Sequence, residues 1–235
     1  MSNQTSLDQI DRAAAPDGSL GAARLLLPMG WVLASVGYYG PWIAHATAGL
    51  TLSGVDMGEF VKFLPGVLDG TLPVTRQMFY LPPFAAAVTI ALLIGSPRLG
   101  YPWLLRVPAL LLAALVSLQL LPPAWSPASL MTAEFRLQTI TLGLCWLLLA
   151  GFWIWGRLPA WLTGSLSAGM AIAAIGLSGW QFYIVKAAID SVYGVPPAIG
   201  WGFVLCMAGL AALATGSVLF VLRTRMRRRA SWPGR

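Results

Sequence analysis

The sequence predicts an all-α fold, a polytopic membrane bundle of six transmembrane helices with both termini on the cytoplasmic side. Three observations predict it. The chain is 57% hydrophobic and 10% charged, with a mean hydropathy of +0.73, whereas about a quarter of the residues of a soluble domain are charged. Six stretches are long and apolar enough to cross a bilayer, and Lys and Arg gather on one side of them.

Each stretch approaches the roughly 20 apolar residues that span the hydrocarbon core. The six cover residues 25–44, 79–95, 103–121, 137–155, 161–185 and 200–222. The second is the shortest and has Pro82 and Pro83 near its start, where the missing N–H costs no helical hydrogen bond. We therefore divide the chain into a flexible cytoplasmic tail, a transmembrane domain and a basic cytoplasmic tail, over residues 1–21, 22–222 and 223–235.

Orientation follows from the positive-inside rule. With both termini in the cytoplasm, the inner segments hold eleven Lys and Arg residues and the outer segments four, which is the expected bias. We predict that the protein lies in the plasma (inner) membrane. A cytoplasmic anchor directly follows the last apolar run and consists of Arg223, Arg225, Arg227, Arg228 and Arg229.

Small residues spaced four apart predict close helix packing, because apolar attraction alone does not hold helices together in lipid. Such faces occur at Gly30/Ala34, Ala87/Ala91/Gly95, Ala109/Ala113/Ser117, Ser165/Gly169/Ala173 and Ala208/Ala212/Gly216. Two inner turns also resemble each other, the one that begins at Arg98 and the one that begins at Arg157, which hints at related hairpins.

The first outer loop, residues 46–77, predicts a short amphipathic helix at the membrane interface. Asp56 followed by Glu59 resembles a pair that caps a helix start. The apolar residues that we expect on one face at helical spacing are Phe60, Phe63, Leu64, Val67 and Leu68. The helix either covers the bundle or forms a gate or partner surface.

The outer loops are longer than the inner turns, and long loops more often carry function. Lys186 and Asp190 are four apart and are expected to pair on one helix face. With Glu134 and Arg136, the outer charges either line a vestibule or are ordinary solvated charges at helix ends. The candidate site for a ligand or partner is Asp56, Glu59, Trp180, Tyr183, Lys186, Asp190 and Tyr193.

The residue inventory argues against an enzyme and predicts no cofactor and no metal. His45 is the only histidine, so neither a pair of axial haem ligands nor a zinc cluster is available. Cys145 and Cys206 both lie inside apolar segments and are expected to act as small hydrophobes. We expect no nucleic-acid binding, because the basic residues form no separate folded face.

Two functions remain open. The first is a transport-associated membrane subunit, a substrate-binding or accessory component that works with partner proteins; the short inner turns disfavour the main permease of an ATP-driven system. The alternative is a structural or assembly subunit of a larger membrane complex. The expected partners are the lipid bilayer and other membrane-protein subunits. A polar cavity reached from outside would distinguish the two functions.

Overall fold

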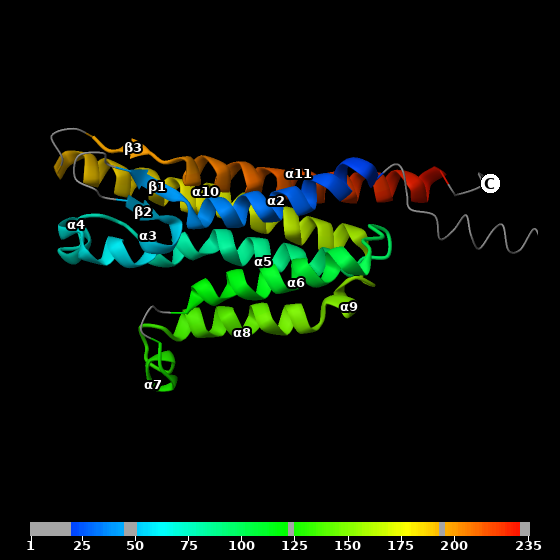
Figure 1. The fold of residues 1–235 in the computed structure, drawn as a ribbon, viewed down its shortest axis with the longest axis horizontal. Helices are drawn as coiled ribbons and strands as arrows, with labels where there is room; N and C mark the ends of the chain where they lie inside the picture. The colour runs from blue at the N-terminus through cyan, green and yellow to red at the C-terminus, as the bar shows by residue number, and fades with distance from the viewer. Residues whose placement is uncertain (1–19, 45–50, 122–124, 193–195, 231–235) are drawn as a thin grey trace, which may run out of the picture.

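The computed structural model describes residues 20–44, 51–121, 125–192 and 196–230. This part of the chain is mostly helical, with ten α-helices, and each predicted apolar stretch overlaps one of the six main ones (Figure 1). They are α2 (Gly21–Tyr39), α5 (Leu81–Leu93), α6 (Trp103–Ser117), α8 (Arg136–Ala150), α10 (Ala160–Val192) and α11 (Trp201–Ala230).

Four helical stretches within the described residues are long and apolar enough to cross a membrane: Arg76–Leu93, Trp103–Leu120, Ala160–Ser191 and Trp201–Met226. The first joins the 3₁₀ turn η3 (Arg76–Tyr80) to α5, and Pro82 and Pro83 occupy the first turn of α5, as predicted. Helix α8 is shorter, and α9 (Phe152–Trp155) follows it after Gly151. The helical class is thus confirmed, and four stretches meet both criteria for a candidate membrane span.

Helix α5 lies at the centre of the bundle, between a group formed by α2, α10 and α11 and a hairpin formed by α6 and α8 (Figure 1). Its sequence is apolar all round, and eleven of its thirteen residues are buried, as expected for a helix enclosed by other helices. Helices α6 and α8 pack loosely by comparison, and Trp146 Nε1 of α8 donates to Ser117 Oγ of α6 at 3.1 Å.

Helices α2 and α11 pack backbone against backbone along a seam of small residues. A Cβ added to Gly30 would lie 2.8 Å from the carbonyl oxygen of Gly209, one added to Gly37 would meet the amide of Cys206, and one added to Gly209 would meet the amide of Ala34. Such an approach maximises van der Waals contact between helices in lipid.

The predicted small-residue faces have mixed outcomes. Gly30/Ala34 and Ala109/Ala113/Ser117 are buried, and Ala87 and Ala91 are buried with Gly95 partly so. The face Ser165/Gly169/Ala173 is wrong as an internal contact, because all three are exposed. On α11 only Gly216 of the predicted face packs against α2; Ala208 is exposed, and the other contacts with α2 come from Gly202, Cys206 and Gly209.

A small antiparallel sheet closes one end of the bundle and was not predicted. Its strands are β1 (Pro41–Ala44), β2 (Thr51–Ser53) and β3 (Ala198–Ile199), in the order β2-β1-β3. The first predicted span is therefore wrong at its end, since helix α2 stops at Tyr39 and strand β1 follows. Trp42 of β1 is fully buried among Tyr38, Phe79, Phe182 and Phe203.

The two predicted tails also change. The predicted N-terminal tail lies mostly outside the described residues, but α2 already begins at Gly21. The basic tail is not separate from the last span, because α11 continues through Ala230. Arg223 and Arg225 are exposed on this helix, and the side chains of Arg227, Arg228 and Arg229 lie outside the described part of the chain.

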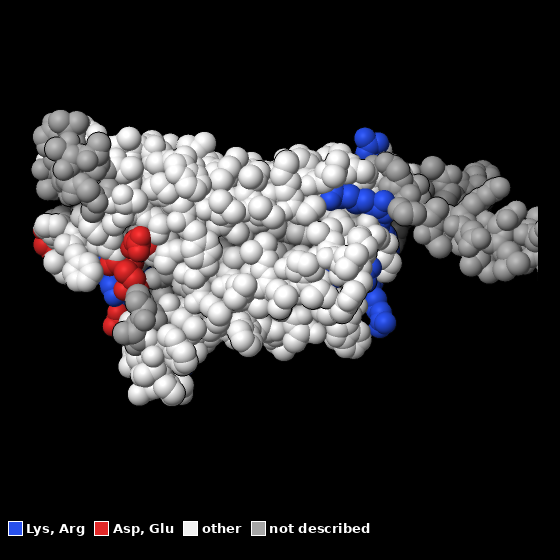
Figure 2. All heavy atoms as spheres, viewed as in Figure 1, with Lys and Arg blue, Asp and Glu red and all other residues white. Residues whose placement is uncertain are grey.

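The described acidic side chains gather at one end of the bundle, whereas the other end carries arginines alone (Figure 2). We call one end the basic end; it carries the described residues Arg24, Arg98, Arg106, Arg157, Arg223 and Arg225. The opposite end, with the sheet, carries every described carboxylate, and we call it the acidic end; these are Asp56, Glu59, Asp69, Glu134 and Asp190. The separation fits the orientation predicted from the sequence.

Candidate functional site at the acidic end

The first loop at the acidic end folds into three short helical pieces rather than one amphipathic helix. They are α3 (Gly54–Phe60), η2 (Val61–Phe63) and α4 (Pro65–Leu68). The chain breaks at Leu64 because Pro65 disfavours a helical residue before it. The predicted apolar face is right only in part. Leu64 is buried and Phe60 and Val67 are partly buried, but Phe63 and Leu68 are each 74% exposed, and Met57 and Val61 complete the buried face.

Asp56 caps the start of α3, as its third residue, rather than lining a vestibule. Its backbone N–H donates to Ser53 Oγ at 3.3 Å, and its carboxylate accepts the backbone N–H of Ser53 at 3.0 Å. This capping box satisfies donors that a helix start leaves unpaired. The predicted pairing of Asp56 with Glu59 is therefore wrong, because the pair is Ser53 with Asp56.

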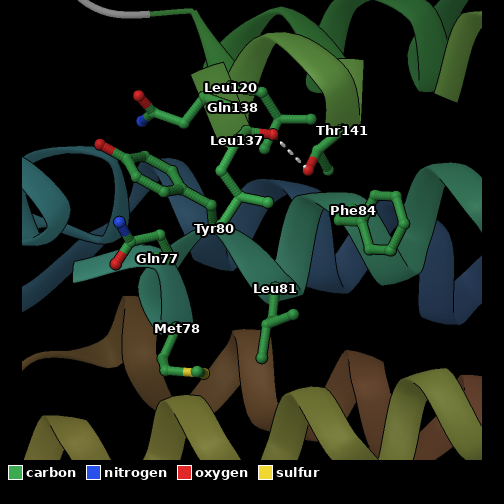
Figure 3. Close-up of a pocket in the computed structure, with 9 residues that line it drawn as sticks. All are labelled: Gln77, Met78, Tyr80, Leu81, Phe84, Leu120, Leu137, Gln138 and Thr141. Carbon is green, nitrogen blue, oxygen red and sulfur yellow. Dashed lines mark hydrogen bonds between the residues drawn. The ribbon is translucent and has the colours of Figure 1, made fainter. Parts of the chain in front are cut away.

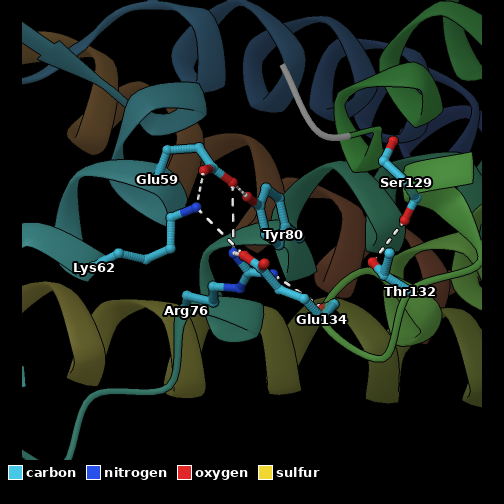
Figure 4. Close-up of polar contacts among 7 residues, drawn as sticks. All are labelled: Glu59, Lys62, Arg76, Tyr80, Ser129, Thr132 and Glu134. Carbon is cyan, nitrogen blue, oxygen red and sulfur yellow. Dashed lines mark hydrogen bonds and ion pairs between the residues drawn. The ribbon is translucent and has the colours of Figure 1, made fainter. Parts of the chain in front are cut away.

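Glu59 lies in a compact cluster of charges with Lys62, Arg76 and Glu134 (Figure 4). Lys62 Nζ is 2.5 Å from Glu59 Oε2 and 3.6 Å from Glu134 Oε1. Arg76 Nη1 is 3.1 Å from Glu134 Oε1 and 3.8 Å from Glu59 Oε1. Two acids and two bases balance in charge, and they join α3, η2 and η3 to the segment before α8.

Arg76 is the best buried member, with its side chain only 10% exposed. Its Nη2 also donates to the backbone carbonyl of Glu134 at 3.1 Å, and its guanidinium lies 5.2 Å from the ring centre of Phe135. A guanidinium fork suits several acceptors at once. Arg76 is therefore the centre of the cluster, although no sequence pattern ranks it above the other outer charges.

The environment of Glu59 favours its ionised form. Burial raises the pKa of this carboxyl, but hydrogen bonds from Lys62 and Tyr80, together with the charges of Lys62 and Arg76, outweigh burial and lower the pKa below its ordinary value of 4.5. The Tyr80 hydroxyl donates to Glu59 Oε1 at 2.9 Å. At neutral pH Glu59 is thus ionised, with Lys62 and Arg76 beside it as counter-ions.

A pocket of about 210 Å³ lies beside this cluster, between η3, α5, the 3₁₀ turn η4 (Leu118–Leu120) that follows α6, and the start of α8 (Figure 3). Tyr80 belongs to both the cluster and the pocket wall. The wall is mostly apolar and contains no charged residue; it consists of Gln77, Met78, Tyr80, Leu81, Phe84, Leu120, Leu137, Gln138 and Thr141. Leu137 at its rim is 56% exposed, so the pocket opens at the side of the bundle.

Gln138 is the one lining side chain that is buried with both polar atoms unused. It is 4% exposed, and neither Nε2 nor Oε1 has a hydrogen-bond partner within the described residues. Thr141, one turn along α8, donates its hydroxyl to the carbonyl of Leu137 at 2.8 Å. A buried amide without partners costs about 1–3 kcal/mol, so Gln138 is the position where a bound molecule would gain most.

The other predicted site residues are not brought to this pocket. The pairing of Lys186 with Asp190 is confirmed, with Nζ at 2.6 and 2.7 Å from the two carboxylate oxygens. Trp180 and Tyr183 are 61% and 56% exposed on α10, and Tyr193 lies outside the described residues. Trp180, Tyr183 and Lys186 line none of the pockets described here.

Sequence reasoning missed Gln138, Tyr80, Gln77 and Arg76. The available signal was Gln138 itself, a side-chain amide one residue inside a predicted span, where polar groups are costly. Cys145 and Cys206 are both buried, on different helices. Among the residues that the structure describes, no three His, Cys, Asp or Glu side chains group as metal ligands; His45 lies outside them.

Together, the apolar spans, the segregated charges and the lateral pocket define a helical membrane protein with a candidate binding site near one membrane face. No protein-family model, curated protein or solved structure matches the chain.

Proposed function

We propose that the chain crosses the plasma membrane six times, with the basic end in the cytoplasm and the acidic end outside. Helix α2 has 19 residues, and α8 with α9 extends over residues 136–155; at 1.5 Å per residue both approach the ~30 Å of a hydrocarbon core. The gathering of arginines at one end supports this orientation.

Cysteine labelling tests the topology. Thr71 and Arg223 are exposed at opposite ends, so Thr71→Cys should react with a membrane-impermeant maleimide in intact cells, and Arg223→Cys only after permeabilisation. The native cysteines are buried, so labelling of the wild-type protein measures the background. Labelling of Arg223→Cys in intact cells would overturn the orientation.

We further propose that the protein is a transport-associated membrane subunit, without catalytic apparatus of its own, that binds a ligand at the acidic end and works with partner membrane proteins. The observation that carries this proposal is the unpartnered amide of Gln138 in the pocket wall. Folding tolerates such a cost at sites where a ligand later supplies the partner, and an apolar pocket with few polar groups is typical of a binding site.

The lining chemistry selects an uncharged amphiphile. No charged side chain faces the pocket, and the nearby Arg76 and Glu134 neutralise each other, so an ionic group would be desolvated without compensation. A head group that both donates and accepts would pair with Gln138, and an alkyl portion would lie against Leu81, Phe84 and Leu137. The lateral opening admits such a molecule from the adjacent leaflet.

Photolabelling tests the binding site. A photoreactive long-chain alcohol should label wild-type pocket residues, and Gln138→Leu should reduce that labelling about five-fold or more, the equivalent of one lost hydrogen bond. Gln119→Leu is the matched control, because it makes the same change at the same end of the bundle outside the pocket wall. Equal labelling of all three proteins would contradict the proposal.

Co-purification in mild detergent tests the association with transport. We expect an ATPase or a permease to remain bound to the intact protein. Recovery of redox subunits, or of the protein alone, would contradict a transport role while leaving the photolabelling result unaffected.

The second candidate is a structural or assembly subunit, favoured by one observation. The exposed face of α10 carries Ser165, Gly169 and Ala173, and a Cβ at Gly169 would meet nothing within 4 Å, so another helix has room to approach. Gly169→Leu should then release partner subunits, as measured by native electrophoresis, without affecting pocket labelling.

A further inference from the structure

A small hollow of about 30 Å³ at the basic end is lined by two arginines from different parts of the chain. Arg98 belongs to the turn between α5 and α6, and Arg225 belongs to the end of α11. The remaining wall consists of Ala160 and Trp161, the first two residues of α10, and of Thr224. The hollow therefore lies where three elements meet.

The hydrogen bonds around the hollow leave most of the N–H groups of Arg98 and Arg225 without an acceptor among the described residues. Arg98 Nη1 reaches the carbonyl of Leu158 at 3.5 Å, the limit of a hydrogen bond, and Arg24 Nη2 donates to the carbonyl of Arg98 at 3.3 Å. Thr224 donates its hydroxyl to the carbonyls of Phe220 and Val221, at 2.8 and 2.9 Å. Arg225 makes none of the hydrogen bonds found among the described residues.

No described carboxylate neutralises this end, because all of them lie at the acidic end. The two guanidinium groups beside the hollow repel each other, and an anion bound between them would attract both. The backbone N–H groups at the start of α10 add partial positive charge on the same side. Guanidinium groups pair well with phosphate oxygens, which accept two hydrogen bonds side by side.

We propose that this hollow binds the phosphate of an anionic phospholipid headgroup in the leaflet at the basic end. Its size suits a phosphate group at its mouth rather than a whole soluble metabolite. Trp161 beside it is 49% exposed, and Leu222, a residue of the last turns of α11, is 44% exposed. These apolar surfaces offer a path for acyl chains, which a free phosphate would not use.

Native mass spectrometry of the full-length protein, released from nanodiscs, tests the inference. The discs contain phosphatidylcholine with or without phosphatidylglycerol. We expect the wild type to retain phosphatidylglycerol in preference to phosphatidylcholine, and Arg225→Gln to lower the retained fraction about five-fold. Arg225 is the residue to substitute because its loss breaks no described hydrogen bond, whereas Arg98 also donates to the carbonyl of Leu158.

Arg223→Gln is the matched control, since it removes the same charge from an exposed position on the same helix outside the hollow. The control should retain lipid within about two-fold of wild type. Equal losses of phosphatidylglycerol in the two variants would show that only the net charge of this end matters, and would contradict a site in the hollow. Equal retention of both lipids, or displacement of phosphatidylglycerol by millimolar inorganic phosphate, would overturn the lipid assignment.

Discussion

The Tyr80 hydroxyl donates a 2.9 Å hydrogen bond to Glu59 Oε1, and through it the charged cluster at the acidic end meets the wall of the lateral pocket. Tyr80 lies at the start of the span that continues into α5, whereas Glu59 belongs to the preceding loop. The contact thus ties the loop to the central helix of the bundle and shields one side of the pocket.

Tyr80→Phe should destabilise the protein by about 1 kcal/mol, because the hydrogen bond to a charged acceptor is lost while the ring remains. The side chain of Glu59 is 22% exposed, so water replaces part of the lost contact. Thermal unfolding in detergent should show a fall of about 2–4 °C. A fall larger than that of Glu59→Gln would show that the hydroxyl has a second role, in the pocket.

Acid should weaken the cluster. The folded-state pKa of Glu59 lies below its ordinary value of 4.5, so its stabilising contribution is fully present above that value and is lost as the pH falls through the lower, folded-state pKa. Unfolding temperatures measured from pH 6 to pH 3 should decline below about 4.5. Glu59→Gln should be less stable than wild type at pH 6 and should decline less steeply. Parallel curves would contradict this account.

The α2–α11 seam should tolerate no added methyl group. Gly37→Ala and Gly209→Ala each place a Cβ against the backbone of the facing helix, and the separation that this forces should cost about 1–3 kcal/mol. Gly169→Ala is the control, since a Cβ there meets nothing within 4 Å in the middle of α10. It should be neutral or stabilising by up to about 1 kcal/mol, which urea or thermal unfolding in micelles would measure.

Gln138→Leu should separate stability from binding. Removing a buried amide without partners should leave stability unchanged or raise it by about 1 kcal/mol, while the photoreactive alcohol loses its polar contact. Unfolding and labelling are measured on the same preparations. Loss of stability together with loss of labelling would show that Gln138 is a structural residue, and the ligand proposal would fail.

The sequence by itself indicated a membrane protein, because the length of apolar stretches and their lack of charge can be read from the order of residues along the chain. The six main helices, the helix start at Pro82 and Pro83, and the pairing of Lys186 with Asp190 also followed from local spacing, since each involves residues within a few turns of one another. In the first outer loop, Phe63 and Leu68 were wrongly assigned to the buried face, because the helix breaks before Pro65 and Met57 and Val61 are buried there.

Only the tertiary structure decided which faces meet and which polar groups share a site. Small residues line several sides of α10 and α11, so spacing alone did not distinguish Gly202, Cys206 and Gly209 from Ala208 and Ala212. The sheet joins strands from opposite ends of the chain, and the charged cluster joins three separate segments. The packing of α8 against α5 buried Gln138 without a partner. Many arrangements of these helices would expose similarly apolar surfaces. Lipid is itself an apolar solvent and does little to favour one of them, so the contacts depend on detailed packing.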